Sequence, residues 1–401
     1  MNAVAVTGLG VVSPHGDDPQ AMFAALMRSE SALRPVFPDL PKPAAAALAA
    51  FDESRWFTKL QLPGVDRVSQ LAVAAADLAM RDAGATAGDV DPQRIGVFAG
   101  CGMGGAAALE AAYRGGGRVP PLTIPAFMPN APAAQVAMRH GVQGLVLTYS
   151  VACASSAAAI AEAAKAVQRG DVDLAIAGGS EALIVPGVVL AWQAMQTLAG
   201  FQPGEAATAI RPFASDRSGF ALGEGAAFLI LESVQRARRR GARTYGLLSG
   251  WGLSCDATHL TKPDAAGQAR ALRAALRQAD LQPRDVGYCN AHGTATRIGD
   301  VVERDALAEV WGDGLDTLRV SSTKALHGHL LGAGGALEAV ITLLALQQLQ
   351  LPPNAHTETI DPACALNLVR QNATSAPGLE AAISNSFAFG GTNAVLLFSR
   401  G

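Results

Sequence analysis

Three residues that lie far apart in the chain have side chains suited to acyl-transfer chemistry: Cys153, His292 and His329. A cysteine thiolate can attack a carbonyl carbon and hold the acyl group as a thioester. Two imidazoles can stabilise the negative charge that develops when a second acyl group loses carbon dioxide. None of these residues is a neighbour of another in the sequence, so only the folded chain can bring them together.

Cys153 begins the run Cys-Ala-Ser-Ser-Ala-Ala-Ala-Ile-Ala, which continues as far as Gly170 and predicts a helix. At the start of a helix, the dipole and the free backbone N–H groups favour a thiolate, so we expect a lowered pKa for Cys153. The alternative is a small buried cysteine packed on alanine, which is the commoner arrangement for an isolated cysteine.

The two histidines are both expected on loops beside glycine. His292 lies in Asn-Ala-His-Gly-Thr-Ala-Thr after a strand-like segment, where loops commonly carry function, although a surface histidine at a glycine turn has the same pattern. His329 ends the stretch Ser-Ser-Thr-Lys-Ala-Leu-His-Gly-His. His327 and His329 alone lack a normal metal ligand set, because no carboxylate lies near them in the sequence. We therefore predict no metal site.

The composition indicates a protein with a large buried core and without nucleic-acid partners. The chain has 401 residues, of which 50% are hydrophobic and 16% charged, with a formal net charge of −3. Binding to a phosphate backbone requires clustered basic residues. The one dense basic run, residues 236–240, is interpreted as a solvated helix face, with contact to an acidic carrier protein as the alternative.

Neither a signal peptide nor a membrane-spanning run is evident in the sequence. A strand-like segment follows the start of the chain without a basic region, and the longest apolar run, residues 339–351, is short. The five cysteines have no paired spacing, which favours reduced thiols. We therefore expect a cytoplasmic protein that does not insert into membranes.

An internal duplication is indicated by three pairs of similar segments that occur in the same order. Residues 220–231 match 387–398, residues 6–10 match 248–252, and residues 94–99 match 285–290. Each half is predicted to run strand, helix, strand, long helix, strand. We predict two related halves that form one compact unit: residues 1–240 with the cysteine, and residues 241–401 with both histidines.

The motifs together resemble the elongating type of β-ketoacyl-(acyl carrier protein) synthase. The resemblance runs from Val-Thr-Gly-Leu-Gly at residues 6–10, through Asn-Ala-His-Gly-Thr at 290–294, to Asn-Ser-Phe-Ala-Phe-Gly-Gly-Thr-Asn at 385–393. It implies the duplicated thiolase-type fold, with five layers α/β/α/β/α. It also implies a dimer, either with a second copy or with a homologous synthase-like subunit.

The resemblance implies a role for each residue of the site. Cys153 would take the acyl chain from its carrier, and His292 and His329 would stabilise the enolate formed from a malonyl carrier. The further implied residues are Lys324 in a charge network with Asp300, Glu303 and Glu338; Phe389, Gly390 and Gly391 at an oxyanion hole and gate; Thr294 and Thr296 at the phosphopantetheine arm; and Met103 and Phe220 in the acyl pocket. The protein would need no cofactor of its own, because the acyl carrier protein brings the phosphopantetheine.

The chain departs from the family pattern at several positions. His327 stands where Thr or Val is usual, Ala388 replaces a glycine of the gate, and Ala214 and Ser218 replace aspartates. Residues 53–67 are less basic than the usual carrier-binding segment. These differences favour, slightly, a specialised polyketide, polyene or lipid pathway over housekeeping fatty-acid synthesis. A thiolase-type acyltransferase and a non-catalytic partner subunit are the alternatives.

Overall fold

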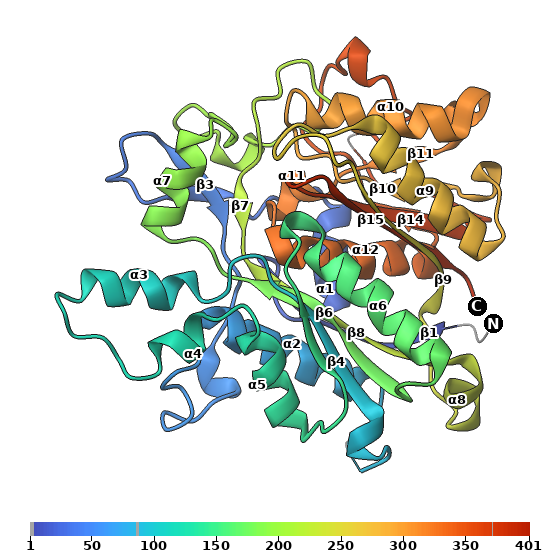
Figure 1. Ribbon diagram of the computed structural model, residues 1–401. Helices are drawn as coiled ribbons and strands as arrows, with labels where there is room; N and C mark the ends of the chain where they lie inside the picture. Colours follow the sequence, from blue (N-terminus) through green and yellow to red (C-terminus); the bar gives the residue numbers. More distant parts are fainter. Residues whose placement is uncertain (1–3, 86–87, 371) are drawn as a thin grey trace.

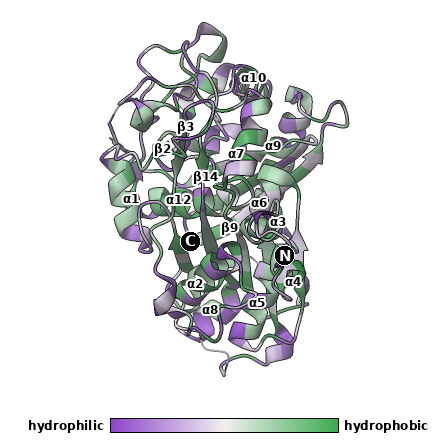
Figure 2. Ribbon diagram, turned by 90° about the vertical axis from the view of Figure 1, so that its left-hand side faces the viewer, coloured by the Kyte–Doolittle hydropathy of each residue, from purple (hydrophilic) through white to green (hydrophobic). Residues whose placement is uncertain are grey.

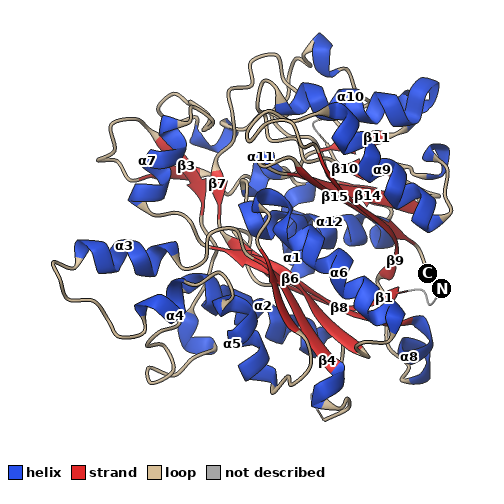
Figure 3. Ribbon diagram, viewed as in Figure 1, coloured by secondary structure: helices blue, strands red, loops and turns tan. Residues whose placement is uncertain are grey.

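The computed structural model describes residues 4–85, 88–370 and 372–401, which contain one ten-stranded sheet (Figures 1 and 3). One half of the sheet consists, in spatial order, of β5 (Val146–Tyr149), β4 (Ile95–Gly100), β6 (Leu174–Glu181), β8 (Gly225–Ser233) and β1 (Val4–Val12). The other half consists of β9 (Gly246–Cys255), β15 (Thr392–Ser399), β14 (Ala381–Phe387), β10 (Tyr288–Asn290) and β11 (Arg319–Ser321). The halves are joined where the first residues of β1 pair with β9.

The two halves have the same topology. If the five strands of each half are numbered in chain order, both halves have the spatial order 3-2-4-5-1 from the outer edge of the sheet to the join. The pairing directions also agree: β4 is parallel to β5 and β6, as β10 is to β11 and β14, and the remaining pairs are antiparallel. The three pairs of similar sequence segments fall on β1 and β9, β4 and β10, and β8 and β15. The repeat in the sequence therefore corresponds to a repeat in the fold.

Three layers of helices enclose the two halves of the sheet. The central layer is formed by α6 (Ser155–Arg169) and α12 (Gly334–Gln348), which contact each other and both halves. The outer layers are formed by α2 (Arg67–Asp82) and α5 (Ala131–His140) on one side, and by α9 (Ala265–Ala279) and α10 (Gly299–Trp311) on the other. This arrangement confirms the five-layered α/β/α/β/α fold expected from the resemblance.

Small residues allow the close packing of these layers. A Cβ atom at Gly10 of β1 would lie 2.0 Å from the carbonyl oxygen of Ala75 in α2, so only glycine fits there. The central helix α12 is hydrophobic on all sides, and the segment Leu331–Gln348 is apolar enough to cross a membrane, but 89% of it is buried inside the protein. Figure 2 shows hydrophobic colour along α12 and the inner strands. The burial of α12 is that of a helix in the core of the protein.

The remaining elements extend from these layers. They are α1 (Pro19–Met27), β2 (Arg34–Val36), β3 (Ala44–Ala47), α3 (Ala106–Arg114), α4 (Thr123–Phe127), α7 (Pro186–Ala194), β7 (Leu222–Gly223), α8 (Val234–Arg239), α11 (Lys324–His327), β12 (Gln350–Leu351) and β13 (Thr374–Ser375). The Pro- and Ala-rich composition of residues 12–65 predicts a loop or cap over the core, but this segment contains a helix, α1. Asp18 caps its first turn by accepting the N–H of Ala21, and Pro19 opens it.

The basic run of α8 is only partly a solvated face. Arg236 and Arg240 pair with Glu232, which is fully buried in β8, so two of the arginines neutralise an internal carboxylate. Arg238 and Arg239 are exposed. All five cysteines are free, and of these only Cys255 is exposed.

Candidate active site

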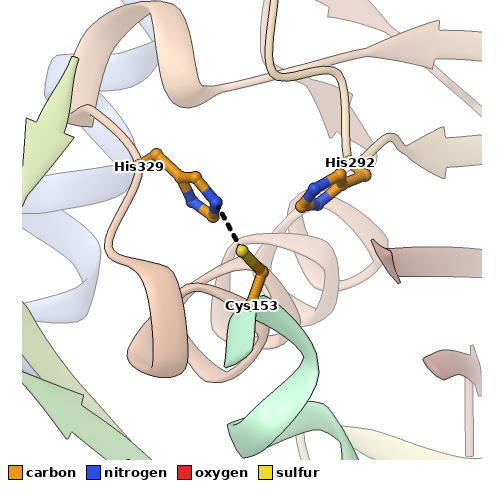
Figure 4. A group of neighbouring side chains, drawn as sticks. All are labelled: Cys153, His292 and His329. Atoms are coloured by element: carbon orange, nitrogen blue, oxygen red, sulfur yellow. Dashed lines mark hydrogen bonds between the residues drawn. The ribbon is translucent and has the colours of Figure 1, made fainter. Parts of the chain in front are cut away.

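Cys153, His292 and His329 meet where the two halves join. His329 Nε2 lies 3.1 Å from Cys153 Sγ, and the reactive atoms of all three side chains lie within 4.8 Å of one another (Figure 4). Cys153 precedes α6, whereas His292 follows β10 and His329 follows α11. The three side chains come from three separate segments and face a common point.

Cys153 lies in a single 3-10 turn, Ala152–Ala154, ahead of the first residue of α6. Ala152 has a left-handed φ of 49°, and the Ser155 hydroxyl fixes the turn by donating to the carbonyl of Ala152 and accepting the N–H of Val151. Strain of this kind requires support from the surrounding structure. The turn directs the sulfur out of the helix and toward the histidines.

Burial controls the acidity of Cys153. Desolvation raises the pKa of its thiol to about 12, and the Lys324 ammonium only partly opposes this increase. The lowered pKa expected from the helix start is therefore wrong for the substrate-free site. Without substrate, Cys153 is therefore a thiol, and its sulfur lies next to an imidazole nitrogen of His329.

His329 is held in one tautomer by the main chain. The N–H of Leu331 donates to Nδ1 at 3.3 Å, which leaves the proton on Nε2, the nitrogen that faces Cys153. Leu331 has a left-handed φ of 46°, so this contact depends on a strained turn. Burial, and then the Lys324 ammonium, hold the pKa of His329 well below its usual range. The side chain is a neutral N–H donor.

His292 is positioned through its own backbone. Glu303 accepts the N–H groups of His292 and Gly293, each at 2.8 Å, and Asn385 donates to the same carboxylate at 3.0 Å. Burial holds the pKa of His292 well below its usual range, so this imidazole is also neutral. Glu303 therefore orients the loop that presents His292.

Lys324 and Glu338 form a fully buried ion pair between α11 and α12. Burial raises the pKa of the Glu338 carboxyl to about 7, against the opposing effect of the Lys324 ammonium. The expected charge network is divided, because Asp300 does not join this pair. Asp300 instead accepts the N–H of Phe213 at 2.7 Å and lies 3.7 Å from Arg217.

The three reactive groups open into a cavity of about 440 Å³. One wall is aromatic: Trp192 stacks on Phe389 with ring centroids 6.0 Å apart, and its edge contacts Phe220 at 5.4 Å. Phe220 in turn contacts His329 edge to face at 5.3 Å. Other lining residues are Met195, Gln196, Thr197, His259, Leu260, Lys262, Thr294, Thr296, Arg297 and Ile298. Such a lining suits a mainly apolar chain with a polar entrance.

The glycine loop after β14 carries Phe389 over the reactive groups. Gly390 and Gly391 have left-handed φ values of 85° and 75°, which only glycine adopts without cost. The N–H of Gly390 donates to the carbonyl of Leu260 at 2.7 Å, so the loop is tied to the segment opposite. Ala388 avoids the left-handed region and donates to Thr392, so the alanine is accommodated without backbone strain.

Thr294 and Thr296 line the same cavity, with their hydroxyl oxygens 3.1 Å apart. Met103 lies outside the lining and is 46% exposed on the loop after β4. His327 is buried and bonded to Thr323 at 2.9 Å, also outside the lining. The third imidazole is therefore separated from the reacting groups.

The trio of Cys153, His292 and His329 is also the type of set that could hold a metal ion. Metal-bound histidines normally donate their second ring N–H to a carboxylate or carbonyl. Here His329 Nδ1 accepts a hydrogen bond instead, and in the described part of the chain His292 Nδ1 has no partner. The donor set fits a nucleophile with two imidazole donors better than a metal centre.

Several residues of the site were not found from the sequence. Trp192 lies in a helix, α7, whose sequence gives no signal of function, and His259, Lys262 and Arg297 reach the cavity from loops. The sequence held one indication of these residues: the polar run His259-Leu-Thr-Lys262 follows a strand, and loops at strand ends commonly contribute to functional sites.

Residues 1–237 match the family model of the β-ketoacyl synthase N-terminal domain, and residues 245–358 match that of the C-terminal domain. The chain belongs to the β-ketoacyl synthase family, whose members are acyltransferases. It is 37% identical to 3-oxoacyl-(acyl-carrier-protein) synthase 2 of Staphylococcus aureus strain N315, over 99% of this chain and 98% of that protein. It is 39% identical to nodulation protein E of Rhizobium meliloti, over 99% of each.

Solved structures with the same fold cover the whole chain. A β-ketoacyl synthase from Burkholderia phymatum superposes with a TM-score of 0.93 at 34% identity, over 100% of both chains. The ishigamide ketosynthase/chain length factor has a TM-score of 0.91 at 31% identity, covering 100% of this chain and 99% of that one. A ketosynthase in complex with its type II polyketide acyl-carrier protein has a TM-score of 0.91 at 28% identity, over 100% of both. The resemblance inferred from the motifs is confirmed.

Proposed function

We propose that this protein is an elongating β-ketoacyl-(acyl carrier protein) synthase that performs a decarboxylative Claisen condensation. The observation that carries the proposal is the meeting of one thiol and two neutral imidazoles within 4.8 Å at the base of a cavity. Neutral N–H donors suit an enolate oxygen, because they stabilise its charge without protonating it outright.

The first half-reaction loads the acyl chain. The sulfur of Cys153 attacks the carbonyl carbon of an acyl thioester on the carrier, and collapse of the tetrahedral intermediate releases the phosphopantetheine thiol. The thiol proton of Cys153 passes to that leaving sulfur, while the N–H of His329 Nε2, 3.1 Å from Sγ, stabilises the negative charge that develops on the Cys153 sulfur. The N–H groups of Cys153 and Phe389 form the proposed oxyanion hole, with Gly390 and Gly391 shaping the turn.

The second half-reaction forms the carbon–carbon bond. Malonyl carrier loses carbon dioxide, and the enolate oxygen accepts hydrogen bonds from His292 and His329. The enolate carbon then attacks the Cys153 thioester, and expulsion of the thiolate gives β-ketoacyl carrier. Lys324 supports this step by helping burial to keep both imidazoles neutral, since the ammonium disfavours a second positive charge.

The alternatives have less support. A thiolase-type reaction uses a second cysteine, and Cys153 is the one cysteine among the described residues that line the cavity. A non-catalytic partner subunit has no need for a complete nucleophile and donor set. The protein itself needs no cofactor under this proposal, because the carrier brings the phosphopantetheine to Thr294 and Thr296.

The proposed partners are an acyl carrier protein and a second synthase-type subunit. The outer edge of β5 is unpaired in the sheet order, and its Val146 and Leu147 are 38% and 41% exposed. An exposed apolar edge strand offers unpaired backbone groups with which a strand of another chain can pair. Relatives named as ketosynthase/chain length factor pairs support a homologous partner, with a homodimer as the alternative.

A specialised polyketide, polyene or lipid pathway in the cytoplasm remains our preferred setting over housekeeping fatty-acid synthesis. The similarity to nodulation protein E and to polyketide ketosynthases supports this preference. The similarity to 3-oxoacyl-(acyl-carrier-protein) synthase 2 supports the alternative. Mass spectrometry of Cys153 after incubation with a panel of acyl carriers would identify the chain that is loaded.

Two substitutions of the nucleophile test the reaction class. Cys153→Ala should abolish condensation, because no other group can hold the acyl chain. Cys153→Gln should block loading but keep malonyl decarboxylation, since the amide resembles the acylated residue. Condensation and carbon dioxide release are measured separately. Full condensing activity in Cys153→Ala would overturn the proposal.

A further inference from the structure

One buried carboxylate close to the reactive groups has no place in the mechanism above. Glu181, the last residue of β6, is fully buried. In the described part of the chain it has no ion pair. It accepts hydrogen bonds from the backbone N–H groups of Gly102 at 2.8 Å, Gly332 at 3.0 Å and Met103 at 3.3 Å, and from the Cys101 thiol at 3.9 Å. A buried charge is costly unless such donors surround it. Its position therefore needs an explanation.

Three segments converge on this side chain so closely that glycine is required. A Cβ atom at Gly102 or at Gly332 would lie 2.5 Å from Glu181 Oε2. A Cβ at Gly332 would also lie 2.5 Å from the backbone nitrogen of Gly102. The carboxylate thus binds the loop after β4 to the 3-10 turn Leu331–Ala333.

That turn is the one that fixes the tautomer of His329. Leu331 precedes Gly332, and its N–H donates to His329 Nδ1 at 3.3 Å. The left-handed φ of 46° at Leu331 is unfavourable for a branched side chain and persists only where neighbouring contacts hold it. Glu181 supplies such a contact one residue further along, at 3.0 Å.

We infer that Glu181 is a positioning residue that, by anchoring the Leu331–Gly332 turn, holds the proton of His329 on Nε2, where it faces Cys153 and the proposed enolate. The inference rests on the condensing function proposed above. Through Gly102 and Met103, the same carboxylate joins this histidine to the loop after β4. Burial raises the pKa of Glu181 to about 7, which is expected of a carboxylate whose partners are neutral backbone amides and a thiol.

Two substitutions at Glu181 separate the hydrogen bonds from the bulk of the side chain. Glu181→Leu removes every acceptor, so the turn loses its anchor. Glu181→Gln keeps one oxygen, which can occupy the Oε2 position and retain the bonds to Gly102 and Gly332. We expect Glu181→Leu to lower malonyl decarboxylation, measured in the Cys153→Gln background, by about tenfold to 100-fold. Glu181→Gln should restore most of it.

The tautomer is read directly by nitrogen NMR of protein labelled at histidine, with His329→Asn used to assign the signal. The native His329 should show an unprotonated Nδ1 and a protonated Nε2, and Glu181→Leu should convert this to a mixture. Glu232→Leu is the matched control, because Glu232 is an equally buried carboxylate that pairs with Arg236 and Arg240, away from the cavity. It should lower stability but leave the His329 signals unchanged.

If Glu181→Leu does not fold, Gly332→Ala provides the same test from the other side, because its methyl group collides with Glu181 Oε2. A folded Gly332→Ala or Glu181→Leu protein with native His329 signals and native decarboxylation would overturn the inference. Loss of decarboxylation in Glu232→Leu to the same degree would also overturn it. Failure of the wild-type protein to condense would instead refute the proposed function, and the NMR result would still decide the role of Glu181.

Discussion

At Cys153 the helix start and the burial of the sulfur have opposite effects on the thiol. The dipole and free N–H groups of a helix start favour a thiolate, but they are worth little more than 1 kcal/mol at most sites. Removal of the sulfur from water is the larger effect and raises the pKa of Cys153 to about 12. Under the proposed mechanism, attack therefore requires a proton acceptor and a group that stabilises the thiolate. The leaving carrier sulfur would accept the proton, and the N–H of His329 Nε2 would stabilise the thiolate.

Alkylation of Cys153 by iodoacetamide should increase steadily with pH. Since the thiolate is the reactive form and the pKa is near 12, we expect about a tenfold rate increase per pH unit between about pH 6 and pH 9, without a plateau. The measurement is the mass of the Cys153 peptide over time. Cys255, which is exposed, serves as the internal reference. A plateau near neutral pH would show that the helix start dominates after all.

At the scale of single residues, the sequence was sufficient for groups in distinctive motifs. Cys153, His292, His329 and Lys324 could be selected because their neighbours are unusual, and the structure brings the first three together. Glu181 and Trp192 could not be selected. Glu181 is bound by backbone amides and the Cys101 thiol, and Trp192 lies on an ordinary helix, so the role of each depends on the segments that pack around it.

Among the elements of the site, the loop from His292 to Arg297 is held at both ends by buried charges. Glu303 holds its beginning, and Arg217 holds its end by donating to the carbonyls of Thr296 at 3.1 Å and Arg297 at 2.8 Å. Ala295 between them has a left-handed φ of 59°, so the loop is strained and depends on these contacts.

Arg217→Lys should weaken the use of carrier substrates. The ammonium preserves a positive charge beside Asp300 and Asp361, but it cannot reach both carbonyls at once. Loss of one hydrogen bond from a charged donor, about 1.5 to 3 kcal/mol, predicts roughly a tenfold or greater loss in kcat/KM for malonyl carrier, mainly through KM. Steady-state kinetics provide the measurement.

Arg211→Lys is the control for this change, because Arg211 pairs with the exposed Asp216 and lies outside the cavity lining. The alkylation rate of Cys153 should be the same in both variants. An unchanged KM in Arg217→Lys, or an equal increase in Arg211→Lys, would contradict the assigned role of Arg217.

The elements themselves were predictable to the extent that each half repeats the other. Three matched sequence segments identified three pairs of equivalent strands, because the pattern of a glycine followed by a buried apolar run is recognisable in both halves. The helix α1 is not predicted from composition, since the Pro and Ala residues between 12 and 65 are typical of a loop. The capping residue Asp18 is a local signal for this helix. Arg236 and Arg240 could not be assigned without Glu232, which lies on β8, inside the sheet.

In the molecule as a whole, the junction of the two halves concentrates titratable groups that burial shifts in opposite senses. The pKa values of Glu181, Asp300 and Glu338 are raised to about 7, whereas those of His292, His327 and His329 are held well below 6.5. Each carboxyl favours the folded state most below its unfolded pKa and loses that contribution as the pH rises through its folded pKa. The histidines oppose this trend up to about pH 6.5, where they become neutral in both states.

Asp300 and Asp361 allow this balance to be tested within one cluster, because both face Arg217 but are buried to different degrees. Burial raises the pKa of Asp300 from 3.8 to about 7, whereas hydrogen bonds from Arg217 and the N–H of Ala363 lower that of the partly exposed Asp361. The unfolded state therefore releases the Asp300 proton first as the pH rises. The stability of the wild-type protein therefore falls between about pH 4 and pH 7, relative to a variant that lacks the titratable carboxyl of Asp300.

We expect the unfolding free energy of Asp300→Asn, minus that of the wild type, to rise over this interval and to level off above about pH 8. Asp361→Asn should show no such rise, since its contribution changes only below about pH 4. Urea denaturation at a series of pH values measures both differences. A flat profile for Asp300→Asn would mean that Arg217, at 3.7 Å, keeps the carboxyl ionised in the folded state and that charge pairing outweighs burial at the junction of the halves.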